Sequence, residues 1–550
     1  MRAAIHLGLQ YPQNYAPRHA KDNQSRGIFD PMPRTEQVET ILASRALDRH
    51  DTALWPFAAT VEKGSDPWRW LTPLIVLAAA LRGVALNQQL WYDEIALVVI
   101  SVRQSLVAIL TVYTSQNQHT LYSVLAHVSV ALFGEQPWAL RLPAVMFGVA
   151  SIPALYFFAR RVTTRREALL ASALMAVSYH HVWFSQNARG YTALLFFTLL
   201  ATYFFLRGLS EGGWRTWLGY SLVMALGMYT HLTMGFVAVG HGLLYLWLLA
   251  GRVRETGRWS REAGLPLAGF LVAGVLTLAL YAPLLPQLFA RTLGQTSPSI
   301  AWEWKSPLWM AQETLRGLRA GAGGALLAIA IAALVALAGL VSYWRENRYV
   351  VALTLLPAVV TAAAMMVLEH NLWPRFFFFA IGFACLFLVR GVIVMAEAAA
   401  RLAGRDARAG VRWGMGLAVL MLAGSAWSLP RAYRYPKQDF VGAMRLVDTQ
   451  RLPDEPVVTV GLTSFAYQRY FGRDWRAVET YSELESVRAQ GRPTWLVYAF
   501  PIHLKARYPE VWKAIQTDFR MVAEFRGTLG GGEIYVCRAD ARQPAFPAAR

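Results

Sequence analysis

Long apolar runs recur along most of this sequence and constrain its fold more than any other feature. Between Trp70 and Leu429 they alternate with short polar turns. Runs of about 20 residues are long enough to cross a hydrocarbon core about 30 Å thick. Charged residues make up only 16% of the chain, below the roughly 25% that is typical of soluble domains. The sequence therefore predicts an α-helical protein that crosses a membrane many times.

We expect about 11 transmembrane helices from the positions of these runs. Segment 119–134 is also apolar, but it carries His119, Ser123 and His127, and counting it as a span would break the alternation of basic loops. We therefore expect this segment, with Ile95–Thr114, to form amphipathic helices on the outer membrane face. The predicted spans are 70–86, 140–160, 168–185, 191–207, 217–231, 233–250, 264–286, 322–343, 350–368, 375–395 and 412–429.

Arginine clusters fall in every second connection between the predicted spans. Short loops rich in Lys and Arg stay on the cytoplasmic side of a membrane. With an odd number of spans, the N-terminus is then cytoplasmic and the C-terminal segment lies outside the cytoplasm. The protein is expected in the cytoplasmic (inner) membrane. The basic connections are 160–166, 207–215, 252–261, 345–348 and 401–412.

The two ends of the chain differ from the apolar middle. Residues 1–67 are polar and contain several prolines, which predicts a mostly disordered cytoplasmic tail with one short helix near Glu36–Arg45. Residues 430–550 alternate short β-rich runs with helical stretches, as in a small α/β domain. No glycine-rich phosphate loop follows a strand there, so we interpret it as an accessory or acceptor-recognising domain. Its predicted strands are 456–462, 494–499 and 533–537, and its predicted helices are 438–449, 464–471, 482–489 and 508–518.

The net charge of +19 would suggest a nucleic-acid ligand in a soluble protein. Here much of the excess falls in the turns between apolar runs, where positive charge sets orientation instead. The chain has two cysteines, Cys385 and Cys537. They fall in different predicted compartments, so the sequence supports neither a disulfide framework nor a cysteine-based metal site.

Ionisable and polar residues collect at the outer ends of the predicted spans. The pair Asp93 and Glu94, in Leu-Trp-Tyr-Asp-Glu, follows the first span. The turn 185–191 is polar, His231 ends a span, and the segment 370–375 leads into one. Each feature alone has a structural explanation, because acids cap helices and arginines reach towards headgroups. Together, at one membrane depth, they indicate function.

This set of residues suits transfer from a lipid-linked phosphosugar. A carboxylate can take the proton of an acceptor hydroxyl, and cations can stabilise the leaving phosphate. No strong general acid is needed, because the phosphate leaves as a stable anion. A transporter or flippase for a lipid-linked or polar substrate is the alternative, but it should show internal repeats and ionisable residues near mid-membrane. We find no clear repeat, which favours the enzyme.

Several short motifs occur in the same order as in a known family. They are Arg82, Leu-Trp-Tyr-Asp-Glu (90–94), Gln-His-Thr-Leu-Tyr (118–122), Phe-Gly (133–134), Trp-Ala-Leu-Arg (138–141), Ser-Gln-Asn-Ala-Arg-Gly-Tyr (185–191) and Trp-Pro-Arg-Phe (373–376). In this order they resemble the polyprenyl-phosphate-dependent membrane glycosyltransferases of the GT-C fold, most of all the protein O-mannosyltransferase and lipid A aminoarabinose transferase group. The resemblance implies a GT-C transmembrane catalytic domain over 68–429, with the Asp-Glu motif in a first extracytoplasmic loop at 87–139.

The resemblance maps Asp93 to the catalytic base and Glu94 to a neighbour that orients the acceptor or the base. By position and charge, we predict that Arg189, His231 and Arg375 bind the donor phosphate. Two positions depart from the family's motifs, because Thr120 replaces a proline and Asn187 replaces a glutamate. The second change removes a charge from the site. Further candidates for substrate binding are Arg103, His119, Tyr122, Gln186, Tyr191 and His370.

The expected reaction moves a sugar from a polyprenyl-phosphate donor to a hydroxyl of a lipid, glycan or protein acceptor. A glycan ligase that uses lipid-diphosphate donors stays an alternative, since the sequence does not exclude charge for two phosphates. Asp93 and Glu94 could share a divalent ion, but no spacing of ligands supports a metal strongly, and no other cofactor is predicted. The sugar and the acceptor are left open.

Overall fold

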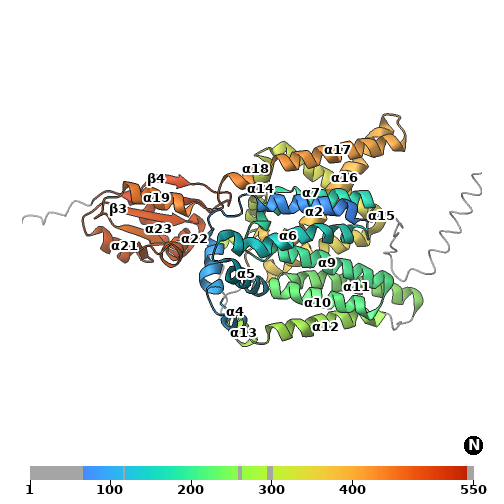
Figure 1. The fold of residues 1–550 in the computed structure, drawn as a ribbon, viewed down its shortest axis with the longest axis horizontal. Coiled ribbons are helices and arrows are strands. Elements are labelled where there is room, and N and C mark those ends of the chain that lie inside the picture. Colours follow the sequence, from blue (N-terminus) through green and yellow to red (C-terminus); the bar gives the residue numbers. More distant parts are fainter. Residues whose placement is uncertain (1–65, 115–117, 258–262, 294–300, 542–550) are drawn as a thin grey trace, which may run out of the picture. The chain divides into compact units, whose positions relative to one another are not determined.

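The computed structural model describes residues 66–114, 118–257, 263–293 and 301–541, without the side chains of 291–293. The predicted disordered tail, with its helix near Glu36–Arg45, falls on residues 1–65 and lies outside the described part. Helices form the apolar middle of the chain, and a five-stranded sheet lies near its C-terminus (Figure 1). This arrangement confirms the predicted fold class, a helical membrane protein with a small C-terminal α/β domain.

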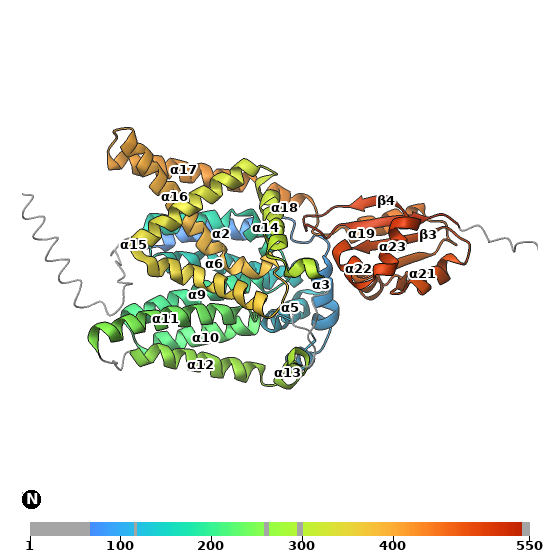
Figure 2. The same cartoon turned by 180° about the vertical axis from the view of Figure 1, so that it is seen from behind.

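Helices coincide with all the predicted spans. Figures 1 and 2 show α6, α9, α10 and α12 side by side, with α6 packed on α9, α9 on α10, and α10 on α12. The helices are α2 (Trp68–Gly83), α6 (Pro137–Ala159), α7 (Arg165–Ala176), α8 (Tyr179–Ser185), α9 (Tyr191–Glu211), α10 (Trp214–Thr230), α11 (Met234–Thr256), α12 (Gly264–Tyr281), α15 (Leu326–Val367), α16 (Ile381–Leu402), preceded by the 3-10 helix η4 (Pro374–Ala380), and α17 (Ala407–Trp427).

The predicted count of about 11 spans is not confirmed. Among the described residues, seven helices are long and apolar enough to cross a membrane. Helix α2 has 16 residues and α10 has 17, and the predicted span 168–185 is broken between α7 and α8. Helix α15 contains two predicted spans in its 42 residues, but its backbone is not helical at Asn347 (φ −157°, ψ 94°). Helix length alone therefore undercounts the apolar runs.

The first long connection is built from short helices. Helix α5 has 14 residues, or about 21 Å at 1.5 Å per residue, which is less than a hydrocarbon core of about 30 Å. The expectation that 119–134 does not cross the membrane stays a prediction, because α2 and α10 are also shorter than this core. The elements are α3 (Tyr92–Leu97), the π-helical turn η1 (Val98–Val102), α4 (Leu106–Thr111) and α5 (Thr120–Phe133). A later connection contains α13 (Leu285–Leu293), the 3-10 turn η3 (Trp302–Lys305) and α14 (Pro307–Ala322).

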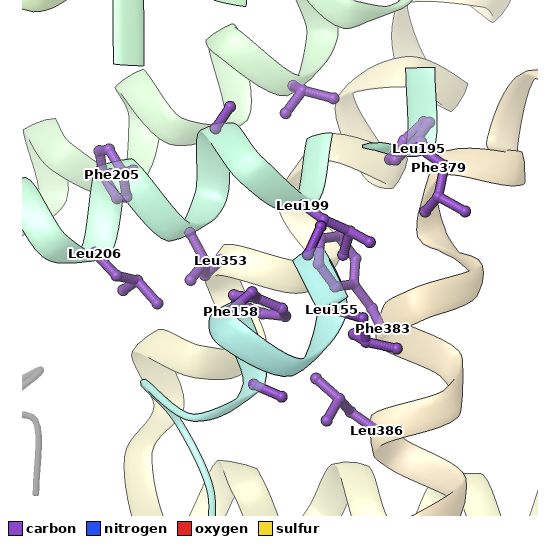
Figure 3. Close-up of a cluster of buried hydrophobic side chains, with 14 of the residues drawn as sticks. Leu155, Phe158, Leu195, Leu199, Phe205, Leu206, Leu353, Phe379, Phe383 and Leu386 are labelled. Atoms are coloured by element: carbon purple, nitrogen blue, oxygen red, sulfur yellow. The ribbon is translucent and has the colours of Figure 1, made fainter. Parts of the chain in front are cut away.

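Apolar side chains from neighbouring helices form the core of the bundle. Figure 3 shows Phe158 of α6 close to Leu199 of α9 and Phe383 of α16. The rings of Phe158 and Phe383 meet edge to face, with centroids 5.4 Å apart. Helices α15 and α16 approach backbone to backbone, because a Cβ on Gly339 would lie 1.9 Å from the carbonyl oxygen of Phe387. Because the helices pack this closely, the positions of their ends are fixed. The connections that carry the candidate site residues start from these ends.

The C-terminal domain contains a mixed sheet with strand order β2-β1-β3-β5-β4. Strand β1 pairs in parallel with β2 and β3, and β5 pairs antiparallel with β3 and β4. The strands are β1 (Val457–Val460), β2 (Arg476–Val478), β3 (Thr494–Ala499), β4 (Arg520–Phe525) and β5 (Ile534–Ala539). The helices are α18 (Pro430–Arg434), α19 (Phe440–Gln450), α20 (Leu462–Phe465) with the π-helical turn η5 (Ala466–Tyr470), α21 (Tyr481–Arg488), α22 (Pro501–Arg507) and α23 (Pro509–Asp518).

Strands β1, β3 and β5 were predicted, whereas β2 and β4 were not. The three predicted strands are the inner ones, and most of their residues are buried. The two missed strands form the edges of the sheet. Strand β2 has three residues, and β4 exposes its first half. An edge strand buries fewer side chains, so its apolar pattern in the sequence is weak.

Candidate functional site

Helix α3 begins immediately after Trp91, whose extended backbone (φ −96°, ψ 171°) ends the connection from α2. Asp93 and Glu94 therefore lie in the first helical turn, where carboxylates are favoured by the helix dipole. Consecutive side chains on a helix point about 100° apart. Asp93 is 8% exposed and Glu94 is fully buried, and the two carboxylates have different neighbours.

Glu94 is held by hydrogen bonds on both oxygens. Arg141 of α6 donates from Nε to Oε1 at 2.8 Å and from Nη2 to Oε2 at 2.6 Å. The amides of Ala188 and Trp91 donate to Oε1 and Oε2 at 2.7 and 3.3 Å. These bonds use the roughly four acceptor positions of a carboxylate. Burial raises the pKa of Glu94, but the charges of Arg141 and Lys437 and the hydrogen bonds outweigh this effect and lower it.

Arg141 also forms hydrogen bonds with the backbone of the connection between α2 and α3. Nη1 of Arg141 donates to the carbonyl oxygens of Leu86 and Gln88 at 2.8 Å each, and Nη2 donates to Gln89 at 3.1 Å. Arg141 is almost completely buried. The pair of Arg141 and Glu94 is therefore a structural clamp that joins α6, the end of the connection and the start of α3.

The polar turn between α8 and α9 is tied to the same region. Nε2 of Gln186 donates to the carbonyl oxygens of Arg82 and Val84 at 3.0 and 2.5 Å. Nε1 of Trp91 donates to Oδ1 of Asn187 at 2.9 Å. Gln186, a candidate for substrate binding, thus holds the end of α2. Asn187 receives the indole of Trp91 at the position where the resembling family has a glutamate.

Asp93 faces an arginine from the start of η4. Its Oδ2 lies 3.5 Å from Nη1 of Arg375, which is longer than the usual range for such hydrogen bonds. The guanidinium carbon of Arg375 lies 3.7 Å from the ring centroid of Trp373. Nε of Arg375 is buried and has no hydrogen-bond partner among the described residues. This arginine therefore keeps donor capacity beside the carboxylate.

Two histidines and a tyrosine lie together near this arginine. The ring centroid of His119 is 4.6 Å from that of His231 and 5.4 Å from that of Tyr191. Nδ1 of His119 accepts a hydrogen bond from the amide of Gly190 at 2.8 Å, which fixes the orientation of its ring. The Oη of Tyr191 is buried and has no hydrogen-bond partner in the part of the chain that is described.

Two arginines supply the positive charge of this cluster. Burial lowers the pKa of His119, and the neighbouring Arg189, His231 and Arg375 lower it further. His119 is therefore neutral near pH 7, and the cationic groups are the arginines. Asp93, a buried carboxylate beside Arg375, can accept a proton, and the two arginines can neutralise a phosphate. We call Asp93, Arg189, His119, His231, Tyr191 and Arg375 the outer cluster.

Besides Glu94 and Gln186, three further candidate residues lie outside the outer cluster. Arg103 forms an ion pair with Glu135 at 2.7 Å, and each side chain is 40% exposed. The Oη of Tyr122 donates to the carbonyl oxygen of Leu140 at 2.9 Å within the core. The side chain of His370 has no hydrogen bond or ion pair with the outer cluster in the described ranges. These contacts lend the three residues no support as substrate ligands, and their roles stay predictions.

Two residues after the last span belong to the site region and were not predicted. Nζ of Lys437, which is 7% exposed, donates at 2.5 Å to a carbonyl of the turn before α9. Burial and the charge of Arg141 lower the pKa of Lys437 to about 7, against the opposite effect of Glu94. Oε1 of Gln438 accepts the amide of Tyr92 at 2.9 Å. Polar residues after a span read as an ordinary linker, so the sequence carries no signal for this role.

The described part of the chain contains no group of three or more His, Cys, Asp or Glu side chains that could hold a metal ion. Glu94 has its acceptor positions occupied by protein donors. Asp93 lies beside Arg375. The geometry of these two carboxylates therefore does not favour a shared divalent ion.

A search against known families matches part of the chain. Residues 117–286 match the family described as dolichyl-phosphate-mannose-protein mannosyltransferase. The matched segment contains Arg189 and His231, but it begins after Asp93 and ends before Arg375. No curated protein sequence matches the chain.

Several solved structures with a similar fold are distant from this chain in sequence. ArnT from Cupriavidus metallidurans in the apo state has a TM-score of 0.50 at 14% identity, covering 86% of this chain and 98% of that chain. The same protein bound to undecaprenyl phosphate has a TM-score of 0.47 at 15% identity, with the same coverage. The S. cerevisiae Pmt1–Pmt2 complex bound to the sugar donor has a TM-score of 0.37 at 18% identity, covering 42% of this chain and 35% of that chain. The likeness to apo ArnT shows the fold alone: this chain has the fold of a multi-pass membrane protein of the GT-C type, and residues 117–286 within it match the mannosyltransferase family.

Proposed function

We propose that this protein moves a sugar from a polyprenyl-phosphate donor to a hydroxyl of a lipid, glycan or protein acceptor. The observation that carries the proposal is the outer cluster, in which the largely buried Asp93 lies 3.5 Å from Arg375. The name of the matched family, dolichyl-phosphate-mannose-protein mannosyltransferase, points to the same class of donor. The donor sugar and the acceptor stay open.

We place the outer cluster on the outer face of the cytoplasmic membrane. Arginines gather at the end of α11 (Arg252, Arg254) and around the turn from α16 to α17 (Arg401, Arg405, Arg408). Figure 2 shows both places at the end of the bundle that lies away from α3. Basic connections stay in the cytoplasm, which puts α3 and Asp93 on the opposite side.

In the proposed reaction, Asp93 takes the proton of the acceptor hydroxyl as its oxygen attacks the anomeric carbon of the donor. The bond from that carbon to the phosphate oxygen breaks, and Arg189 and Arg375 stabilise the charge on the leaving phosphate. The contact between Asp93 and Arg375, at 3.5 Å, is weak enough to be exchanged for a phosphate. Nε of Arg375 and Oη of Tyr191 are further donors for it.

We assign Glu94 to positioning and not to proton transfer. Its acceptor positions are used by Arg141 and by the amides of Ala188 and Trp91. Taking up a proton would cost Glu94 at least one of these bonds. The clamp instead fixes the start of α3 and with it the position of Asp93.

A transfer assay with purified protein tests the proposal. Radiolabelled polyprenyl-phosphate sugars are mixed with host membrane extract and with wild type, Asp93→Asn or Glu135→Gln, the last removing an exposed carboxylate outside the cluster. We expect label to reach an acceptor with wild type and Glu135→Gln only. Wild-type rates from Asp93→Asn would overturn the assignment of the base. Transfer from lipid-diphosphate donors alone would favour a glycan ligase, and donor binding without any transfer would favour a transporter or flippase.

A further inference from the structure

The C-terminal sheet has a point at which its connections diverge. Strand β1 leads to β2 on one side, whereas β3 lies on the other side of β1 and leads away towards β4 and β5. The parallel strands β1 and β3 therefore end side by side, with connections that run in opposite directions. In open α/β sheets, ligands bind outside the carboxyl ends of strands at such a point.

Both strands end in an unusual backbone conformation. Gly461 follows β1 with φ +67°, and Phe500 follows β3 with φ +55°. A positive φ is strained for a residue with a side chain, and such strain gathers at functional sites. A Cβ on Gly461 would lie 3.0 Å from Leu504 and 3.6 Å from Nδ1 of His503. Glycine is therefore what allows the end of β1 to approach α22 this closely.

His503 has a polar atom without a protein partner at this place. The residue is 7% exposed, and its Nδ1 has no hydrogen-bond partner among the described residues. Burial lowers the pKa of His503, and the neighbouring Arg507 lowers it further. The neutral ring has one donor and one acceptor nitrogen. A buried polar atom without a protein partner is unfavourable unless a ligand or a water satisfies it.

Aromatic rings join this place to the start of α3. The ring centroids of Phe465 and Phe500 lie 6.2 and 6.1 Å from that of Tyr92. The ring of Tyr508 lies 6.1 Å from that of His503. All four aromatic side chains are only partly buried. Because Tyr92 directly precedes Asp93, these rings lie next to the residue that we assign as base.

We propose that Tyr92, Phe465, Phe500, His503 and Tyr508 form a binding site for a pyranose ring of a glycan acceptor. This inference rests on the proposed function and narrows its acceptor to a carbohydrate. Binding sites for small polar ligands combine an aromatic lining with a few polar groups that fix orientation. The CH faces of a sugar pack on aromatic rings, and Nδ1 of His503 is available to a sugar hydroxyl. We call these residues the acceptor cluster.

The position of the acceptor cluster favours a sugar over a peptide. An extended peptide adds to the exposed edge of a sheet. The edges here are β2 and β4, whereas the acceptor cluster lies at the ends of the inner strands β1 and β3. Burial raises the pKa of the Tyr508 phenol, and the charge of the exposed Glu479 raises it further.

Saturation-transfer difference NMR on the full-length protein tests this site directly. The probes are the methyl glycosides of mannose, glucose and galactose, with a short Ser/Thr-containing peptide as the competing class. The variants are His503→Ala and Phe500→Gly, and glycine suits the positive φ at 500, so that variant should fold. The control is Tyr535→Ala, which removes an aromatic ring that stacks on Tyr498 at 4.9 Å in the same sheet.

We expect at least one glycoside to bind wild type and Tyr535→Ala, with its signal reduced at least about fivefold in both cluster variants, as expected when a site's few orienting and lining groups are removed. Absence of glycoside binding to wild type, or equal binding to Phe500→Gly, would overturn the inference. Peptide binding that is lost in the same variants would also overturn it and would point to a protein acceptor.

Asp93→Asn separates this inference from the proposed function. It should bind the glycosides as wild type does and lose only transfer. If the cluster variants lose glycoside binding but wild type transfers no sugar, the proposed function fails and the glycan site stands. If transfer depends on Asp93 while the acceptor KM is unchanged in His503→Ala, the inference fails and the proposed function stands.

Discussion

Asp93 and Glu94 are neighbours in one helical turn, yet their carboxylates differ in how many hydrogen bonds they accept. On one side, Glu94 accepts hydrogen bonds at 2.6 to 3.3 Å on both oxygens and is fully buried. On the other side, the carboxylate of Asp93 has one polar contact in the described part of the chain, to Arg375 at 3.5 Å. A saturated carboxylate holds a scaffold together, whereas one with spare acceptor positions can take up a proton. Two adjacent acidic residues can therefore have different roles, one in proton transfer and one in holding the structure.

The largest expected effect tests the Asp93 side. In Asp93→Asn, we expect the transfer rate to fall by about 10²–10⁴-fold, because the general base is lost. The unfolding temperature should change little, since within the described ranges the Asp93 carboxylate has one ion-pair contact, and that contact is long. Initial rates and thermal unfolding in detergent measure both. A large loss of stability with little loss of rate would reverse the roles that we give to the two carboxylates.

The next largest effect is a loss of stability when the Glu94 carboxylate is changed. Glu94→Gln removes the negative charge from a buried pair and leaves Arg141 uncompensated, which we expect to cost about 3–5 kcal/mol of stability. Chemical denaturation in detergent measures this loss. Glu135→Gln is the matched control, because its pair with Arg103 is 40% exposed and should be worth about 0–1 kcal/mol. Equal losses in the two variants would contradict a clamp at Glu94.

A smaller effect is expected at the arginine that touches Asp93. In Arg375→Ala, the donor KM should rise by about 10- to 100-fold, since hydrogen bonds to charged groups are worth about 1.5–3 kcal/mol. Steady-state kinetics with varied donor measure it, and Arg473→Ala is the control, because Arg473 pairs with Asp448 in the C-terminal domain. An unchanged donor KM with a lower kcat would mean that Arg375 acts on Asp93 and not on the donor phosphate.

The smallest effect concerns the lysine that supports the clamp. The pKa of Lys437 is about 7 in the folded protein and about 10.4 in an unfolded chain. Between these values the unfolded chain binds more protons, so the contribution of Lys437 to stability rises with pH. The unfolding temperature of wild type minus that of Lys437→Met should therefore increase from pH 7.5 to pH 9.5. A difference that stays flat over this pH range would contradict the lowered pKa of the buried Lys437 amine.

Much of the fold could be predicted because its signals are local. A run such as 191–207 is apolar along its whole length, and α9 (Tyr191–Glu211) forms there. The inner strand at 494–499 was predicted with its observed bounds. The broken span at 168–185 was missed, because the turn between α7 and α8 lies inside an apolar stretch. The edge strands β2 and β4 were missed because β2 has three residues and β4 exposes its first half.

The sequence by itself determined which residues are costly to bury and where along the chain they stand. It placed Asp93, Arg189, His231 and Arg375 at the ends of apolar runs. Only the tertiary structure decided their partners, because Asp93 and Arg375 are 282 residues apart and Glu94 and Arg141 are 47 apart. Burial in a membrane follows from local composition, whereas a hydrogen bond between distant residues depends on how whole helices pack. For this reason, the roles of the two neighbouring carboxylates could be told apart only in three dimensions.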